Sequence, residues 1–339
     1  MTLIHMKGRF FMRHLITPLL GSLTLLLTGC QRQLSENPVV SERYFHKYGY
    51  AVSKNEFEDR KYPGQVITTL KTGITITSAY ENGILHGPTT HTFPHSQTVE
   101  SYFLYNQGNL VKQIQYNIHG MPLREELQLS PNRFSTTKWY EDGTPMSMEE
   151  YEGSQLHEGS YLSQNNEVET RVVGGKGTRL VKDQKGHLEA QEEIYHGYTV
   201  KRESFYPNGA PESIAYYTDG VLNGEKKLFT ESGEPLAIKE YLNGKLHGKT
   251  TFFKNGLRTV EMHYLDGVKN GLEIHYIDGG TPSQEITWEN DHKHGPSRYY
   301  AGGLAQLEYF YDGKLVSENR WHELNKLDNM IQQINASNW

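Results

Sequence analysis

One aromatic side chain recurs along the last part of the chain at a nearly constant interval. From residue 217 the steps are 24, 23, 24 and 23, through Tyr217, Tyr241, Tyr264, Trp288 and Tyr311. A glycine follows each of the first four by seven residues, and a second aromatic follows each glycine by five: Gly224 and Phe229, Gly248 and Phe253, Gly271 and Tyr276, Gly295 and Tyr300. Self-similarity at a fixed period near 23 indicates a repeat architecture. Repeat arrays build long surfaces, which favours binding over catalysis.

The content of one unit predicts a β-hairpin. Between residues 217 and 241, two glycine-rich breaks separate two runs of strand length, and the breaks come too often for a helix. In the second run Ala237 and Tyr241 share one face, and Leu236 lies on the other. The two aromatics of a unit then lie near the ends of adjacent strands, where we expect them to stack within and between hairpins.

The interval extends toward the N-terminus, where Tyr151, Val173, Tyr195 and Tyr217 are spaced by 22 residues. It blurs between about 95 and 140, where we expect degenerate repeats with a bulge or longer loop near Pro131. The predicted fold is all-β: an extended, single-layer array of antiparallel β-hairpin repeats over residues 57–320, with about 10–11 units.

The segments that flank the array differ from it in composition. Residues 30–56 are polar and without a clear period, which favours a tether. Residues 321–339 are predicted to form a short C-terminal helix that caps the last repeat or ends in a tail. Its apolar residues follow helical spacing: Leu324, Leu327, Ile331 and Ile334.

The first 29 residues have the pattern of a secretory signal. Lys7, Arg9 and Arg13 precede a 14-residue apolar run at 15–28, and no acid occurs before it ends. The run is shorter than the about 20 residues that a spanning helix needs.

The end of this signal, Leu27-Thr28-Gly29-Cys30, resembles the bacterial lipobox. The resemblance implies cleavage before Cys30, the only cysteine, and attachment of a diacylglycerol and an acyl chain to it. The alternative is an ordinary cleaved signal with an unmodified cysteine. The expected location is the cell membrane or the outer membrane, and Gln31 after the cysteine favours the outer membrane. The predicted partner at Cys30 is thus the membrane itself.

Charge argues against nucleic acid as a partner. Cleavage before Cys30 removes Lys7, Arg9 and Arg13, leaving 31 basic and 40 acidic residues and a net charge of −9. An acidic chain without basic clusters is a poor nucleic-acid binder.

The repeated unit Y-x-[DN]-G-x-x-x-G-x-x-x-x-[FY] resembles the MORN repeat in its bacterial variant form, best at 217–229, 241–253 and 264–276. The resemblance implies twisted antiparallel sheets of hairpins that contact proteins and sometimes lipids. Bacterial members are often labelled antitoxin components, a function that needs a cytosolic partner.

Residue types that could carry chemistry occur in the array, but their positions favour structural roles. Histidine recurs before glycine at His86, His119, His196, His247 and His294, and the same slot holds Asn223 and Asn270. We interpret the slot as a turn position that tolerates positive φ, not as a metal site. The acidic groups at Glu149, Glu150 and Glu152 and at Glu189, Glu192 and Glu193 are read as polar strand faces. Gly174–Gly177 lacks the spacing of a phosphate loop. We therefore predict no enzyme, no catalytic residue, no metal site and no cofactor.

Three functions follow from these patterns. The leading one is a membrane-anchored lipoprotein whose repeat sheet binds or scaffolds a protein in the cell envelope. The second is a glycan- or lipid-binding envelope module, which would use exposed aromatic rows as stacking platforms. The third is an antitoxin-like protein.

Replacement of Cys30 tests the anchor. Cys30→Ser should leave the precursor unprocessed and abolish acyl labelling, because the thiol is the predicted attachment point. Metabolic labelling with a fatty acid and detergent partitioning measure the two effects. Unchanged labelling and partitioning of the variant would refute the prediction.

Overall fold

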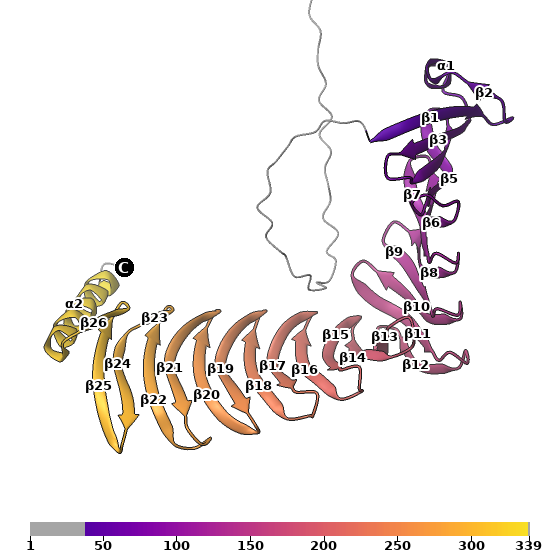
Figure 1. The fold of residues 1–339 in the computed structure, drawn as a ribbon. Helices are drawn as coiled ribbons and strands as arrows, with labels where there is room; N and C mark the ends of the chain where they lie inside the picture. The colour runs from indigo at the N-terminus through magenta and orange to yellow at the C-terminus, as the bar shows by residue number, and fades with distance from the viewer. Residues whose placement is uncertain (1–37, 338–339) are drawn as a thin grey trace, which may run out of the picture. The chain divides into compact units, whose positions relative to one another are not determined.

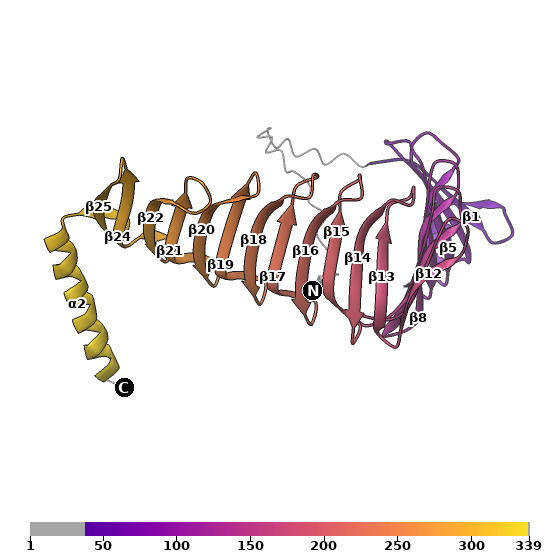
Figure 2. The same ribbon diagram turned by 90° about the horizontal axis from the view of Figure 1, so that it is seen from below.

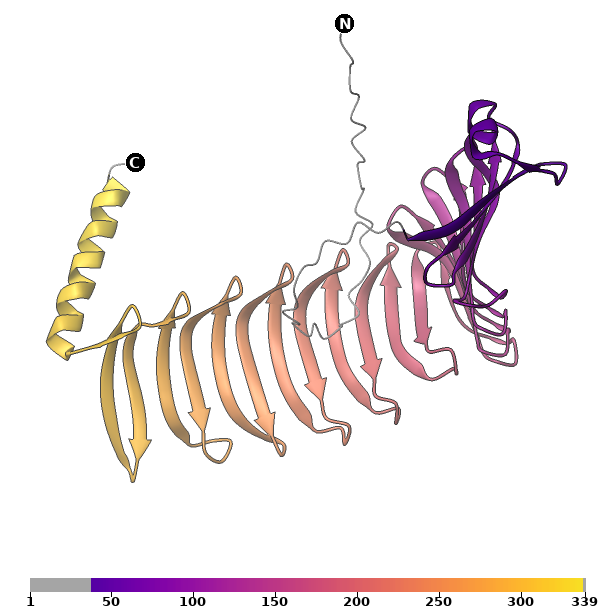
Figure 3. The ribbon, with the colours of Figure 1, turned by 45° about the horizontal axis from the view of Figure 1, so that its top comes forward.

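The computed structural model describes residues 38–337. Their fold is all-β, as predicted: one long, open, antiparallel sheet of 26 strands with a single C-terminal helix beyond it. A short helix, which the sequence did not predict, lies near the start. Strands follow one another side by side in chain order (Figures 1 and 2), and the strands from β15 to β22 are bowed along their length (Figure 3).

The elements in chain order are β1 (Val39–His46), β2 (Ala51–Val52), α1 (Lys54–Asp59), β3 (Gly64–Leu70), β4 (Thr75–Glu81), β5 (Ile84–Thr92), β6 (Val99–Asn106), β7 (Asn109–Tyr116), β8 (Pro122–Ser130), β9 (Arg133–Trp139), β10 (Pro145–Glu152), β11 (Gln155–Leu162), β12 (Val168–Val173), β13 (Lys176–Lys182), β14 (Leu188–Tyr195), β15 (Tyr198–Phe205), β16 (Pro211–Thr218), β17 (Val221–Phe229), β18 (Pro235–Leu242), β19 (Lys245–Lys254), β20 (Leu257–Leu265), β21 (Val268–Tyr276), β22 (Pro282–Glu289), β23 (His292–Lys293), β24 (Gly295–Ala301), β25 (Leu304–Tyr311), β26 (Lys314–Val316) and α2 (Glu318–Ser337).

Two-residue turns of Asp or Asn followed by Gly connect the two strands of many hairpins. Both residues have positive φ, for example 50° at Asn243 and 80° at Gly244. A type I′ turn requires this combination, and its twist matches that of the flanking strands. The same pair of positive φ angles occurs at Asn82-Gly83, Asp219-Gly220, Asp266-Gly267 and Asp312-Gly313.

The 23-residue period reflects strand register. Three of the four glycines that follow the recurring aromatic by seven residues lie directly opposite the aromatic that opens the next unit: Gly224 opposite Tyr241, Gly248 opposite Tyr264, and Gly271 opposite Trp288. The fourth, Gly295, lies opposite Phe310, one residue before Tyr311. In the first three pairs the glycine has no side chain to compete with the ring on that face. It also has a positive φ, 94° at Gly248, and it lies where the pairing with the preceding strand shifts register. The same glycine thus adopts the backbone conformation of the bulge and leaves room for the aromatic ring on the neighbouring strand.

Burial separates the two faces of the sheet. Direct cross-strand partners connect most buried residues into one face, which we call the packed face; its members include Tyr44, Thr89, Thr136, Glu149, Val172, Glu192, Ala215, Ala237, Thr250, Glu273 and Ile286. The opposite face, to which Leu236 and Tyr216 belong, is called the open face; both side chains are 41% exposed. The predicted alternation in β18 therefore holds, with Ala237 buried and Leu236 exposed.

Hydrogen bonds between turns join successive hairpins along one margin of the sheet. The Gly244 amide donates to the Leu222 carbonyl at 2.8 Å, and the Gly267 amide donates to the Leu246 carbonyl at 2.8 Å. These two hairpins are therefore tied to their predecessors by a turn as well as by a strand. This is the nearest-neighbour coupling expected of a repeat array.

The interpretation of the histidine slot as a turn position holds for only some of its members. Among the histidines in question, His196 has a positive φ of 50°, whereas His86 and His247 lie within strands without one. The side chains instead reach the turn of the next hairpin. The Gln107 amide donates to His86 Nδ1 at 3.2 Å, and the Asp312 amide donates to His294 Nδ1 at 3.4 Å. The ring nitrogen therefore explains the slot at His86 and His294, whereas His119 and His196 lie in turns, as interpreted.

The array also begins earlier than predicted. β1 pairs with β3 from Val39 to His46, so much of the expected tether at 30–56 belongs to the sheet. Near Pro131 a two-residue connection joins β8 to β9, and the predicted bulge lies between Gln128 and Ser130. No longer loop occurs there. The interpretation of residues 30–56 as a tether relied on their polar composition, and it is wrong for β1 because the strands of a one-layer sheet need not be apolar.

The terminal helix forms, but its apolar stripe does not pack as a cap. The Tyr311 hydroxyl donates to the Asp328 carboxylate at 2.8 Å, and the Tyr309 ring lies 5.5 Å from that of Trp321. By contrast, Leu327 and Ile331 are 52% and 55% exposed. The helix therefore contacts β25 through polar and aromatic side chains of its first three turns.

Replacement of Gly248 tests the role of the motif glycine. A Cβ there would lie 2.2 Å from Glu240 Oε2, at a φ of 94°. We expect Gly248→Ala to lower the free energy of unfolding by about 1–3 kcal/mol through backbone strain, and by more if Glu240 is displaced. Gly256→Ala is the matched control, because it has a φ of 72° but nothing within 4 Å of its Cβ. Equal losses in urea denaturation would contradict a specific role for Gly248.

Candidate functional site

The predicted lipidation site, Cys30, lies outside the described residues. Within residues 38–337, neither helix is long and apolar enough to cross a membrane. The candidate sites considered among the described residues are a buried charge cluster, the two hollows of greatest volume and the repeated aromatic rings.

The charge cluster is built from the acidic groups that the sequence placed on polar faces. Glu149 and Glu192 are 4% and 3% exposed, on the packed face of β10 and β14. Glu150 is on the open face and pairs with Arg133 at 3.0 Å. Sequence reasoning thus named the carboxylates but missed that two of them are buried.

Arg179 of β13 joins the two buried carboxylates. Its Nε lies 2.8 Å from Glu149 Oε1, and its NH1 lies 3.2 Å from Glu192 Oε2. Arg179 and Glu192 are direct cross-strand partners, whereas Glu149 is three strands away in the order of pairing. The packed faces of β10 and β13 therefore meet, which makes this region a corner of the sheet.

Glycines and a small apolar core make the corner possible. Gly159 and Gly177 lie in the ladder between Glu149 and Ile194. A Cβ on Gly177 would lie 2.1 Å from the Arg171 carbonyl oxygen, so no larger residue fits. The core that packs beside the cluster consists of Leu156, Tyr161, Val172 and Ile194.

Every charged atom of the cluster has partners. Tyr151 and Tyr161 hydroxyls donate to Glu149 at 2.8 and 2.9 Å. Glu192 accepts from Arg202 as well as from Arg179, and from the Thr199 hydroxyl at 3.3 Å. Buried ions require such compensation, because an unpaired buried charge is costly.

The electrostatics follow from this pairing. Burial would raise the pKa of Glu149, but the charge and hydrogen bonds of Arg179, with the two tyrosine hydroxyls, hold its pKa below the ordinary value. Burial and the nearby Glu149 carboxylate raise the pKa of Tyr151 and Tyr161. General-acid catalysis by a carboxyl needs a raised pKa, which is the opposite of what Glu149 shows. The arrangement suits a structural clamp.

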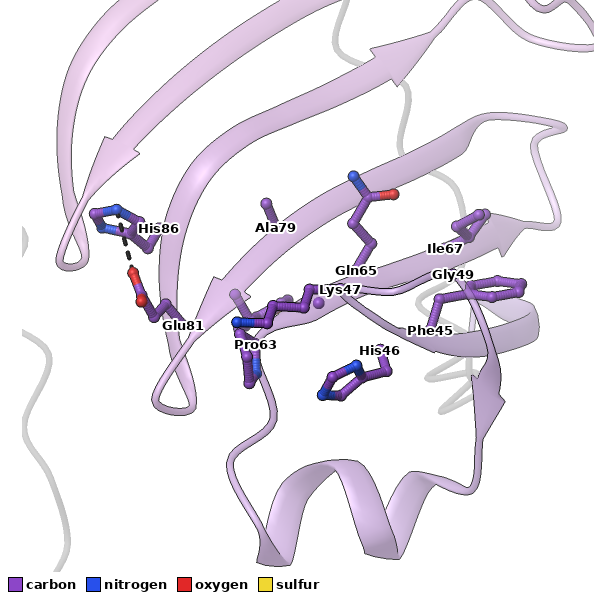
Figure 4. A pocket seen from close by; sticks show the side chains of 12 residues that line it. Phe45, His46, Lys47, Gly49, Pro63, Gln65, Ile67, Ala79, Glu81 and His86 are labelled. Atoms are coloured by element: carbon purple, nitrogen blue, oxygen red, sulfur yellow. Dashed lines mark ion pairs between the residues drawn. The ribbon is translucent and has the colours of Figure 1, made fainter.

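A hollow of about 520 Å³ lies on the open face of the first strands (Figure 4). Phe45, Gln65 and Ala79, which are cross-strand partners in a row, form its floor. His86 and Glu81 pair at 3.4 Å at one side, as the dashed line in Figure 4 marks. Its lining mixes apolar and polar groups, as in a surface that receives protein side chains. Sequence reasoning missed it, because Phe45 lay in the expected tether.

A second hollow, of about 630 Å³, lies at the corner on the packed face. Lys138 lines it, and burial lowers the pKa of this lysine. Glu189 lines it as well, together with Arg124 and Lys182. Since both signs of charge are present, the hollow has no evident preference for a charged ligand.

Two of the repeated aromatics in the later units, both half-buried, lie beneath cations. Arg258 lies 4.0 Å from the centre of the Tyr276 ring, and Lys269 lies 4.4 Å from that of Trp288. The expected stacking of ring on ring occurs at Phe134 and Tyr151, with centres 4.9 Å apart. In the later repeats a cation lies over Tyr276 and Trp288, an attraction of about 0.5–2 kcal/mol. The Tyr311 ring instead lies 4.9 Å from that of His294, and the Tyr264 hydroxyl donates to Met262 Sδ at 2.8 Å.

Comparisons with known proteins identify no family. No family model matches the chain, and no curated protein matches its sequence. Among solved structures, the chain is similar to one described as "Crystal Structure of TcdB2-TccC3 without hypervariable C-terminal region", at 10% identity and a TM-score of 0.19. The match covers 80% of this chain and 18% of that chain.

Breaking the charge cluster should destabilise the corner. Arg179→Met leaves the buried Glu149 with only tyrosine donors, and we expect a loss of about 3–5 kcal/mol in the free energy of unfolding. Arg133→Met is the matched control: it removes an exposed partner of Glu150, for which we expect a loss of at most about 1 kcal/mol. Urea denaturation with hydrogen exchange over β10–β15 measures both.

The same cluster sets a pH dependence. The pKa of Glu149 is lower in the folded chain than in the unfolded one, so its stabilising contribution is complete above the unfolded pKa and is lost as the pH falls toward the folded pKa. Arg179→Met should weaken this acid-side loss. Identical acid denaturation curves for the variant and the wild type would contradict a clamp at this position.

Proposed function

We propose that this chain is a membrane-anchored lipoprotein whose MORN-like repeat sheet binds or scaffolds a protein partner in the cell envelope. The basic, apolar and Leu27-Thr28-Gly29-Cys30 segments support the anchor, through Cys30, in the cell membrane or the outer membrane. The proposal assigns no catalytic activity and no cofactor to the chain. In its support, the buried carboxylates Glu149 and Glu192 have their hydrogen-bonding and ionic partners within the protein.

One observation carries the binding function: large apolar side chains stay exposed on the open face. They occur on strands from β10 to β25, at Met148, Val173, Tyr195, Tyr216, Leu236, Leu272 and Leu307, with exposures between 37% and 62%. Apolar side chains that are exposed on one face of a sheet offer area that a partner protein can bury. A single-layer sheet has no second layer to cover this face, so a partner would gain its full area.

The alternative, a glycan- or lipid-binding module, is less well supported by the rings themselves. Stacking on a sugar requires a free ring face. Arg258 and Lys269 already lie over Tyr276 and Trp288. An antitoxin-like function remains the third possibility, and it would require a cytosolic pool of the chain.

Site-specific photocrosslinking tests the proposal in the full-length chain. A photoreactive phenylalanine analogue replaces Tyr216 or Leu236 on the open face, and Ile277 serves as the matched control, because it is 73% exposed but lies in a loop after β21. Cells that express each variant are irradiated, and adducts are resolved by mass. We expect the same discrete protein adduct at Tyr216 and Leu236, and none at Ile277. Adducts that are absent from the open face, or equal at all three positions, would refute a binding surface there.

A further inference from the structure

Two lysines face each other in the middle of the packed face. Lys226 of β17 and Lys239 of β18 are direct cross-strand partners, and Lys239 has Thr250 of β19 as its partner on the other side. Side chains that are paired in this way have Cβ atoms about 4.5–5.5 Å apart, and like charges at this position are destabilising.

Neither lysine is neutralised by the protein. Among residues 38–337, no carboxylate forms an ion pair with Lys226 or Lys239. The Lys239 ammonium lies 5.6 Å from the centre of the Phe252 ring, which orients it without removing its charge. The Thr250 hydroxyl beside it is buried and has no hydrogen-bond partner either.

The other charges along the same row of the packed face are compensated. On one side Arg202 is bound by the buried Glu192. On the other, Glu273 accepts from Lys269 at 2.8 Å and contacts His275 at 2.6 Å. The part of this row that lacks ion pairs is therefore short: it contains two positive charges, and the charged residues beyond both of its ends form ion pairs.

The carboxylates of the same two strands are directed away from the lysines. Glu225 and Glu240 are cross-strand partners on the open face. Glu225 binds Lys227 at 3.0 Å, and Glu240 accepts from the Lys249 amide at 2.9 Å. The carboxylates of these two strands therefore lie on the opposite face of the sheet from Lys226 and Lys239.

We propose that Lys226 and Lys239 form a binding site for an acidic segment of a partner protein, which would place neighbouring carboxylates against the two ammonium groups. This inference rests on the proposed function, because the ligand is a protein. Charge complementarity supports it. The short length of the site matches a pair of carboxylates, whereas the net negative charge of the chain opposes long polyanions such as nucleic acid.

A direct binding measurement tests the site without the natural partner. The full-length chain in detergent is titrated with a fluorescent hexaglutamate peptide at low ionic strength, and hexaserine serves as the control peptide. We expect Lys226→Gln with Lys239→Gln to weaken hexaglutamate binding about tenfold. The matched control is Lys245→Gln with Lys254→Gln, which removes two exposed lysines at the ends of β19 and should leave the affinity unchanged.

Stability provides the second readout. Because the two ammonium groups repel each other, the doubly substituted Lys226 and Lys239 variant should unfold at the same or a higher temperature than the wild type, and the difference should shrink in salt. A loss of binding with a lower unfolding temperature would mean damage to the fold and would overturn the assignment.

Two further outcomes would also overturn it. Equal affinity of hexaglutamate for the wild type and the Lys226 and Lys239 variant would place binding elsewhere. If inorganic phosphate, added at the same total concentration of negative charge as the peptide, displaced the peptide fully, the site would be assigned to phosphate groups. Neither outcome bears on the open-face adducts, so a failure here is distinguishable from a failure of the proposed function.

Discussion

The register between successive strands is the constraint on which the remaining structure depends. With Gly248 opposite Tyr264, and Gly224 opposite Tyr241, these units position their rings against a residue that has no side chain. The same glycine absorbs a bulge through its positive φ. A shift of one residue would move every side chain to the other face. The turns between hairpins add a second tie, such as the bond from the Gly267 amide to the Leu246 carbonyl.

This register creates two unlike faces in a single layer. Small and medium side chains such as Ala215 and Thr250 are buried on the packed face, while Tyr216 and Leu236 stay exposed on the open face. Because most of the sheet has no second layer, its stability comes from contacts between neighbouring hairpins. The open face is left free for a partner, which is the physical basis of the proposed binding function.

The corner at β10–β15 is the exception to this one-layer arrangement. There Arg179 reaches Glu149 across the sheet, and a small apolar core with Tyr161 and Val172 packs beside the pair. A buried ion pair is a weak source of stability but is costly to break. We therefore interpret the cluster as a device that fixes the geometry of the corner. The Lys226 and Lys239 pair is its counterpart without an ion-pair partner among the described residues, which is the basis of the proposed site for an acidic segment.

Local sequence determined the hairpins, the period and the alternation of faces, because turn chemistry and the side-chain period of two act over a few residues. Asn243-Gly244 is an example of the turns, and Leu236 and Ala237 are an example of the alternation between faces. The helical spacing of apolar residues near the C-terminus likewise predicted the terminal helix. Tertiary structure alone decided what depends on residues far apart in the chain: that β1 joins the sheet, that His86 binds the next turn, and that Glu149 meets Arg179. It also decided that Lys226 faces Lys239, because the register between strands is set by the whole ladder. The sequence alone does not show whether a lysine or carboxylate in a strand has an oppositely charged side chain beside it.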